Sequence, residues 1–237
     1  MSSTKQQAQS AGLLYFLVAL TAPLGLLYVP AKLIVTGNAS ATAENIRTSE
    51  WLLRLGIASE LIHQTIAVFL VLALYRLFKP VNEALARQVV ILGALLSVPI
   101  MFVNVLNAVA AQIFASGPKY LSVFDKPQRD ALAYLFLHLH SRGIVVASIF
   151  WGLWLFPFGI LVIRSGFIPR VLGYLLIIAG VGYAASSFTT LVLPRYAELV
   201  SKIALPLEMG ELPIIFWLLI WGARTRSTDA SASPPPA

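Results

Sequence analysis

A small set of polar side chains interrupts otherwise apolar stretches of the sequence, and these are the side chains that could do chemistry. Burying an ionisable group in an apolar segment is expensive, so each one marks a candidate functional site, with helix pairing as its alternative role. The carboxyl groups of the set are Glu60, Glu208 and Glu211. The amides, imidazoles and guanidinium are His63, Gln64, Asn104, Asn107, His138, His140 and Arg142.

The spacing of these residues predicts that several share a helix face. Glu60 lies three residues before His63 and four before Gln64, and side chains at these separations project from one side of a helix. The two asparagines are three residues apart, as are the two late glutamates. His138 and His140 are two residues apart, which predicts that they diverge.

Counting residues from the basic residue that closes each apolar segment estimates depth in a membrane. At about 1.5 Å per residue, Glu60, Asn104, Glu208 and Glu211 come out at about 20 to 25 Å, and Arg142 at about 33 Å. We therefore expect Glu60, Asn104 and Glu211 to surround one cavity in the outer third of a bilayer. We expect Arg142 to cap this cavity and to pair with Glu208.

Such a cavity suits acid–base chemistry on a lipid-like molecule. A carboxyl group removed from water favours its protonated form and can donate a proton to an alkene or epoxide. Glu60 is the predicted proton donor, and His63 and Glu211 are the other predicted catalytic residues. The predicted ligand-binding residues are Gln64, Asn104, Asn107, Arg142, Tyr183, Glu208 and Trp217. The two aromatic members could stabilise a developing cation through their ring faces.

Other kinds of site have less support in the sequence. Glu60 and His63 form one Glu-x-x-His step, but carboxylate-bridged di-iron bundles need two. There is no HExxH motif and no cysteine, so we predict neither a metal nor a cofactor. Two non-enzymatic functions stay open: a proton-coupled carrier or ligand-binding membrane protein, and an assembly protein whose polar cluster only pairs helices.

The elements that must position these residues are membrane-spanning helices. The chain has 237 residues, 58% hydrophobic and 11% charged, with a mean hydropathy of +0.82. Soluble domains carry about 25% charged residues, so this surface must face lipid. Stretches long enough to cross occur at residues 11–35, 52–77, 89–114, 132–163, 171–193 and 203–221.

The predicted fold is therefore an all-α, polytopic transmembrane bundle of about six helices. Residues 1–224 form one domain, residues 225–237 form a disordered tail, and residues 42–50 begin a short surface helix. The net charge of +7 comes from scattered basic residues, which anchor membrane helices and do not indicate nucleic acid. Their slight excess on the N-terminal side predicts that both termini are cytoplasmic. The expected partners are membrane lipid and a small apolar or amphipathic ligand, with the oligomeric state left open.

The fifth apolar segment carries a family resemblance. Residues 164–183, RSGFIPRVLGYLLIIAGVGY, resemble bacterial membrane proteins of domain-of-unknown-function family 4386. Weaker matches are Arg54 to Ile57, Lys79 to Asn82, and Gly210-Glu211 followed by Trp217 and Gly222, so the resemblance runs from about residue 44 to residue 222. It implies a six-helix protein of the bacterial inner membrane and brings no established reaction.

A looser likeness concerns chemistry. Small integral-membrane terpene cyclases of meroterpenoid pathways are similar in length and look like this chain in having an early acidic residue, matched by Glu60, and a late one, matched by Glu208 or Glu211. Their late acid is typically Asp and they tend to have seven spans. The likeness implies cyclase-type chemistry on an isoprenoid-like substrate.

Overall fold

The computed structural model describes residues 4–223 and is built from helices, with no strand in that range. Six helical segments in it are long and apolar enough to cross a membrane. They are Thr4–Leu33, Glu50–Phe78, Glu83–Ser116, Lys126–Ser165, Arg170–Val192 and Pro194–Ile220. The prediction of six spans is confirmed, and the protein is a multi-pass membrane protein.

Three of the six spans are interrupted. The first consists of α1 (Thr4–Pro23), a π-helical stretch η1 (Leu24–Tyr28) and α2 (Val29–Leu33). The third consists of α5 (Glu83–Val90), a π-helical stretch η2 (Ile91–Leu96) and α6 (Ser97–Ser116). The sixth consists of the 3-10 turn η4 (Pro194–Tyr196), α9 (Ala197–Glu208), the 3-10 turn η5 (Met209–Glu211) and α10 (Leu212–Ile220). Such irregular turns occur frequently at functional sites.

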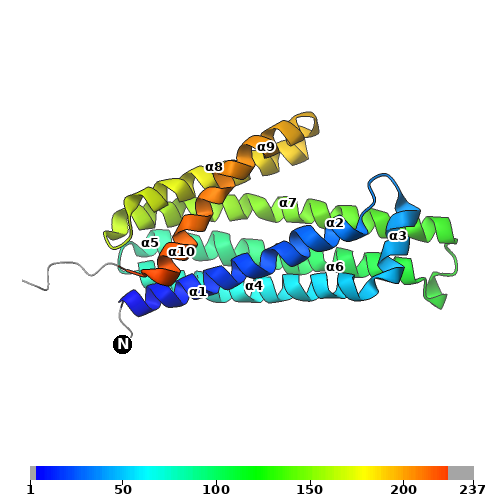
Figure 1. The fold of residues 1–237 in the computed structure, drawn as a ribbon, viewed down its shortest axis with the longest axis horizontal. Helices are drawn as coiled ribbons and strands as arrows, with labels where there is room; N and C mark the ends of the chain where they lie inside the picture. The colour runs from blue at the N-terminus through cyan, green and yellow to red at the C-terminus, as the bar shows by residue number, and fades with distance from the viewer. Residues whose placement is uncertain (1–3, 224–237) are drawn as a thin grey trace, which may run out of the picture.

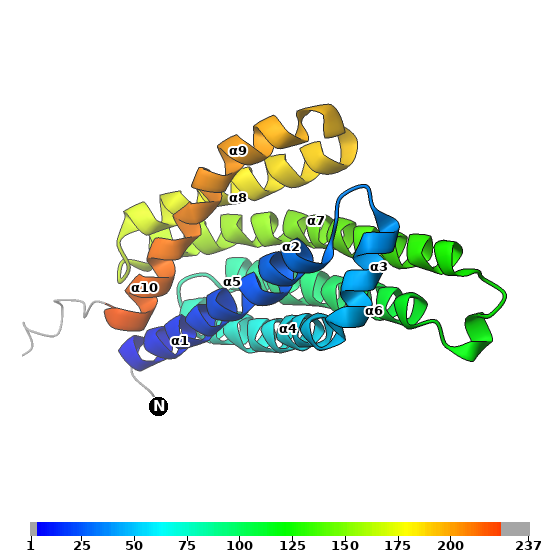
Figure 2. The same ribbon diagram turned by 45° about the vertical axis from the view of Figure 1, so that its right-hand side comes forward.

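The uninterrupted spans are α4 (Glu50–Phe78), α7 (Lys126–Ser165) and α8 (Arg170–Val192). Helix α7 packs against α6 and α8, while α1 packs against α4 and α10. Figures 1 and 2 both show the hairpin of α8 and α9 leaning away from the other helices at its turn, whereas α10 returns to lie across α1. The bundle is therefore wedge-shaped on this side.

Both ends of the described chain lie at the same end of the bundle (Figure 1). The Gln9 amide donates to the Ile220 carbonyl at 3.4 Å, and a Cβ on Gly222 would lie 3.0 Å from the Lys5 carbonyl oxygen. An even number of spans requires this arrangement. Which side of the membrane holds the termini stays a prediction, and the predicted disordered tail lies outside the described residues.

A short helix closes the opposite end. Helix α3 (Ala39–Thr48) begins at Asn38, whose side chain accepts a hydrogen bond from the Ala41 amide. Arg47 on α3 pairs with Glu44 and with the buried carboxylate of Asp130 on α7, each at 2.8 Å. The hydrogen bond that Arg47 donates to Asp130 raises the pKa of Arg47, so the guanidinium stays charged. The predicted surface helix near residues 42–50 is confirmed.

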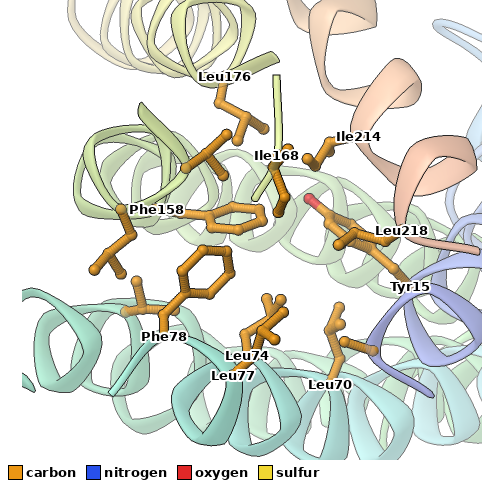
Figure 3. Close-up of a cluster of buried hydrophobic side chains, with 14 of the residues drawn as sticks. Tyr15, Leu70, Leu74, Leu77, Phe78, Phe158, Ile168, Leu176, Ile214 and Leu218 are labelled. Atoms are coloured by element: carbon orange, nitrogen blue, oxygen red, sulfur yellow. The ribbon is translucent and has the colours of Figure 1, made fainter. Parts of the chain in front are cut away.

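The hydrophobic core has two parts. The larger part, at the end that holds the termini, contains Tyr15, Phe78, Phe158, Ile214 and Leu218 (Figure 3). The smaller part lies under α3, where α2, α4, α6 and α7 meet.

Helices α7 and α8 pack closely because glycines face each other. A Cβ on Gly180 would lie 2.8 Å from the Gly152 carbonyl oxygen, and one on Gly173 would lie 2.5 Å from that of Gly159. Small residues allow this close approach in membrane proteins. Gly173 and Gly180 of the segment at residues 164–183 thus serve helix packing.

Candidate functional site

Glu60, His63 and Gln64 on α4 are all buried but lie in two different regions. Glu60, His63 and Gln64 are 5%, 9% and 1% exposed. Glu60 borders a small cavity under α3, whereas His63 and Gln64 line a much larger cavity nearer the middle of the bundle. The predicted common face of α4 therefore divides between two sites.

The first site is a hydrogen-bonded cluster around His140. Its Nε2 lies 3.0 Å from Oε2 of Glu60, and its carbonyl oxygen accepts a hydrogen bond of 2.9 Å from the Asn104 amide. Asn107 in turn donates to Asn104 Oδ1 at 3.1 Å. The adjoining cavity has a volume of about 20 Å³, room for about one water molecule.

Two glycines make room for this cluster. A Cβ on Gly143 would lie 1.9 Å from Asn104 Oδ1, so no other residue at this position leaves the asparagine in place. A Cβ on Gly25, in the π-helical stretch η1, would lie 2.8 Å from Glu60 Cγ. The cluster thus joins η1, α4, α6 and α7 through close contacts.

The second site is a cavity of about 420 Å³ among α1, α4, η2, α7, α8 and the sixth span. This volume lies within the range of ligand pockets, about 300 to 1,000 Å³. Its lining is mainly apolar, with a few polar side chains. The polar lining residues are Tyr15, His63, Gln64, Ser97, Tyr183, Glu208 and Glu211.

Glu211 is the central polar group of this cavity. The Tyr15 hydroxyl on α1 donates a hydrogen bond to Glu211 Oε1, and Tyr183 on α8 is a second tyrosine beside the same carboxyl group. Glu211 reaches them because the sixth span breaks at η5, between Pro206 in α9 and Pro213 in α10. A proline supplies no backbone donor, so helical hydrogen bonding is weakened on both sides of this turn.

His63 and Gln64 differ in how their polar atoms are satisfied. His63 Nδ1 lies 3.1 Å from the Val18 carbonyl oxygen and 3.3 Å from Thr21 Oγ1. The Nε2 of Gln64 is fully buried and finds no hydrogen-bond partner among the described residues. Buried polar groups are nearly always paired, so the unpaired Gln64 amide beside the cavity is an exception to the usual pattern.

Aromatic rings form another wall of the cavity. Trp151 and Trp154 on α7 line it together with Tyr15. The Tyr15 and Trp154 ring centroids are 5.9 Å apart, and Trp154 stacks on Phe158 at 5.5 Å. These rings offer broad apolar faces that also attract cations.

The mouth of the cavity is apolar and exposed. Leu27, Leu205 and Met209 line it and are 67%, 56% and 51% exposed. Leu27 belongs to η1, Leu205 to α9 and Met209 to η5. Because these residues belong to membrane-spanning segments, their exposed surface faces lipid.

The expectation that Glu60, Asn104 and Glu211 surround one cavity is wrong. Glu60 and Asn104 join the His140 cluster, and Glu211 lies in the larger cavity. The depth count assumed that all spans start level and run parallel. In fact Glu60 and His140 touch, although they lie 16 and 24 residues from the basic residues Arg76 and Arg164 used as references.

Two further expectations fail on geometry. Arg142 has no ion pair with Glu208 in residues 4–223; it donates instead to the Thr190 carbonyl oxygen at 3.2 Å. Trp217 does not line the large cavity, and its ring stacks on Trp221 with centroids 5.0 Å apart. The predicted divergence of the two histidines is confirmed, since His138 packs on Tyr134 while His140 contacts Glu60.

Three cavity-lining residues escaped the sequence reasoning. Tyr15, Trp151 and Trp154 are aromatic residues in apolar segments, which resemble ordinary lipid-facing or core residues until the fold brings them together. His140 stands out by its residue type, but no local pattern in the sequence indicates that Glu60 on α4 is its partner. The described part of the chain contains no group of three or more His, Cys, Asp or Glu residues placed to hold a metal ion.

Fold and site together define a multi-pass helical membrane protein with a ligand-sized cavity inside the bundle. The chain belongs to the family described as Domain of unknown function (DUF4386), whose model matches residues 10–222. An uncharacterized protein of Archaeoglobus fulgidus is 37% identical over 76 residues, which is 32% of this chain and 44% of the archaeal one. The chain thus spans under half the length of that curated relative. No solved structure matches the chain.

Proposed function

We propose that this protein binds a small amphipathic, lipid-like molecule inside the membrane, in the cavity that Glu211 and Gln64 line. The observation that carries the proposal is the buried, unpaired Gln64 amide beside a cavity of about 420 Å³. Leaving a buried donor unsatisfied costs about 1 to 3 kcal/mol, and a ligand acceptor would remove that cost. The ligand therefore has a polar group with at least one acceptor oxygen.

The route of entry supports a lipid-soluble ligand. The mouth residues Leu27, Leu205 and Met209 are apolar and face lipid, so a molecule dissolved in the bilayer can enter sideways. The polar wall then receives its head group, while the apolar wall covers its chain. We place this site in the cell inner membrane with both termini cytoplasmic.

Acid–base chemistry on the bound molecule is the second candidate function. The Tyr15–Glu211 hydrogen bond favours it, because this pair lies in the ligand-sized cavity and could exchange a proton with a bound molecule. Glu60 borders only the space of about 20 Å³ and is held by His140. Its role as proton donor stays a prediction, and the geometry favours Glu211 for a lipid-like substrate.

Filling the cavity tests the binding proposal. Ala67 lines the cavity on α4, so Ala67→Phe should occupy the space that a ligand needs. Ala58, on the exposed face of the same helix, offers the matched control Ala58→Phe. Lipid extracted from purified wild type and from the Ala58→Phe protein should contain the same enriched molecule. Loss of that molecule in Ala67→Phe supports the proposal, and an unchanged or absent bound lipid in all three proteins contradicts it.

A further inference from the structure

The charges around the large cavity restrict which amphipathic molecule fits it. Two carboxyl groups, Glu208 and Glu211, belong to the lining, which includes no lysine or arginine. A carboxylate in a low-dielectric site repels another anion strongly and attracts a cation. The lining therefore disfavours fatty acids and other anionic amphiphiles as ligands.

Three features favour a positive charge over a neutral head group. The Tyr15 hydroxyl donates a hydrogen bond to Glu211 Oε1, which fixes this carboxyl group in the cavity lining. A carboxylate in lipid needs a counter-charge, and the lining holds no lysine or arginine to supply it. The aromatic rings of Tyr15, Trp151, Trp154 and Tyr183 line the same space, and such rings with a carboxylate are the usual means of recognising organic ammonium groups.

The two glutamates also mark a path from the lipid to this position. Glu208 is half-buried at the end of α9, next to the mouth residues Leu205 and Met209, and has no ion pair among residues 4–223. Glu211 lies one 3-10 turn further along. A cation that enters between α9 and α1 meets the Glu208 carboxyl first and the Glu211 carboxyl next.

We infer that the ligand is a lipophilic cation, an amphiphile whose ammonium group lies against Glu211 and the aromatic wall and whose acceptor oxygen meets the Gln64 amide. This inference rests on the proposed function, because it assigns the charge of the molecule that the cavity binds. The chemistry named is an organic ammonium with a nearby ester, ether or hydroxyl oxygen on an apolar chain.

Three laurate esters of similar size test the charge directly. Lauroylcholine carries a trimethylammonium group, 3,3-dimethylbutyl laurate replaces its nitrogen by carbon, and lauroyl isethionate carries a sulfonate. Each is radiolabelled and its equilibrium binding to the protein in phosphatidylcholine nanodiscs is measured, with empty nanodiscs as the correction for lipid partitioning. Wild type should bind the choline ester more tightly than the carbon ester by about tenfold or more, and the isethionate ester least.

Variants assign the preference to the carboxyl group. Glu211→Gln keeps the shape and hydrogen bonding of the side chain but removes its charge. Lauroylcholine and 3,3-dimethylbutyl laurate should therefore bind this variant about equally. Glu208→Gln should weaken binding of the choline ester by a smaller factor. Should Glu211→Gln fail to fold, the ranking of the three esters by wild type still decides the charge.

The possible failures are distinguishable. If the carbon ester or the isethionate ester binds wild type as tightly as the choline ester, or if the preference survives in Glu211→Gln, the cation inference is wrong while the cavity remains a ligand site. If no ester binds wild type above the empty nanodiscs, or if Ala67→Phe binds all three as wild type does, the proposed function fails and the inference fails with it.

Discussion

The Glu60–His140 pair gives a quantitative test of the structure. Both side chains are 6% exposed, and their polar atoms are 3.0 Å apart in the membrane-spanning part of the bundle. Removing one partner of a buried charged or hydrogen-bonded pair costs about 3 to 5 kcal/mol, because the other partner stays buried without compensation. Replacing both partners by apolar residues of similar volume is close to neutral, since neither group then needs a partner.

We therefore expect His140→Leu to lower the free energy of unfolding by about 3 kcal/mol and Glu60→Leu by a similar amount. The double variant should lie within about 1 kcal/mol of wild type. The exposed pair of Glu198 and Lys202, whose atoms are 2.7 Å apart, provides the control, because Lys202→Met should cause no measurable change.

Unfolding in mixed micelles, titrated with a denaturing detergent and followed by circular dichroism, measures the free energy of unfolding of wild type and of each variant. The reasoning is refuted if the effect of the double variant equals the sum of the two single effects. That result would mean that Glu60 and His140 do not compensate each other. It would also contradict the contact between Glu60 and His140, which separates these two residues from the large cavity.

Three further outcomes are expected elsewhere in the chain. Reporter fusions after Lys79 and after Lys126 should give opposite signals, because α5, η2 and α6 cross the membrane between them; equal signals would contradict the six-span topology. Gly180→Leu should destabilise the protein by more than about 2 kcal/mol, since its Cβ would lie 2.8 Å from a carbonyl oxygen of α7, whereas Ala185→Leu on the exposed face should be tolerated; equal melting temperatures would refute the close packing. Arg47→Met should loosen α3 from its buried aspartate partner and speed hydrogen exchange of the α3 amides, and unchanged exchange would show that the ion pair is dispensable.

Much of the fold is predictable because each membrane span signals itself locally. An apolar run of about 20 residues is a property of neighbouring residues, and so are the turn and charge signals at its ends. The six spans and the short helix near residues 42–50 could therefore be assigned from hydropathy and breakers. The π-helical stretches η1 and η2 have no such signal, because they depend on how these helices pack against their neighbours.

The candidate site was only partly predictable. That Glu60, His63, Gln64 and Glu211 are unusual follows from residue type alone, because any polar group in lipid is costly. Their partners could not be identified, since Tyr15 and Glu211 are separated by 196 positions and Glu60 and His140 by 80.

Local chemistry thus determined that this chain crosses a membrane and which of its side chains are expensive to bury. Tertiary structure decided which of those side chains meet, through helix tilt, the break at η5 and the divergence of α9 from α1. A depth counted along straight, parallel helices takes none of these three features into account. The physical reason is that burial is a property of one residue and its immediate neighbours, whereas a cavity is shared by helices whose relative positions depend on the packing of the whole bundle.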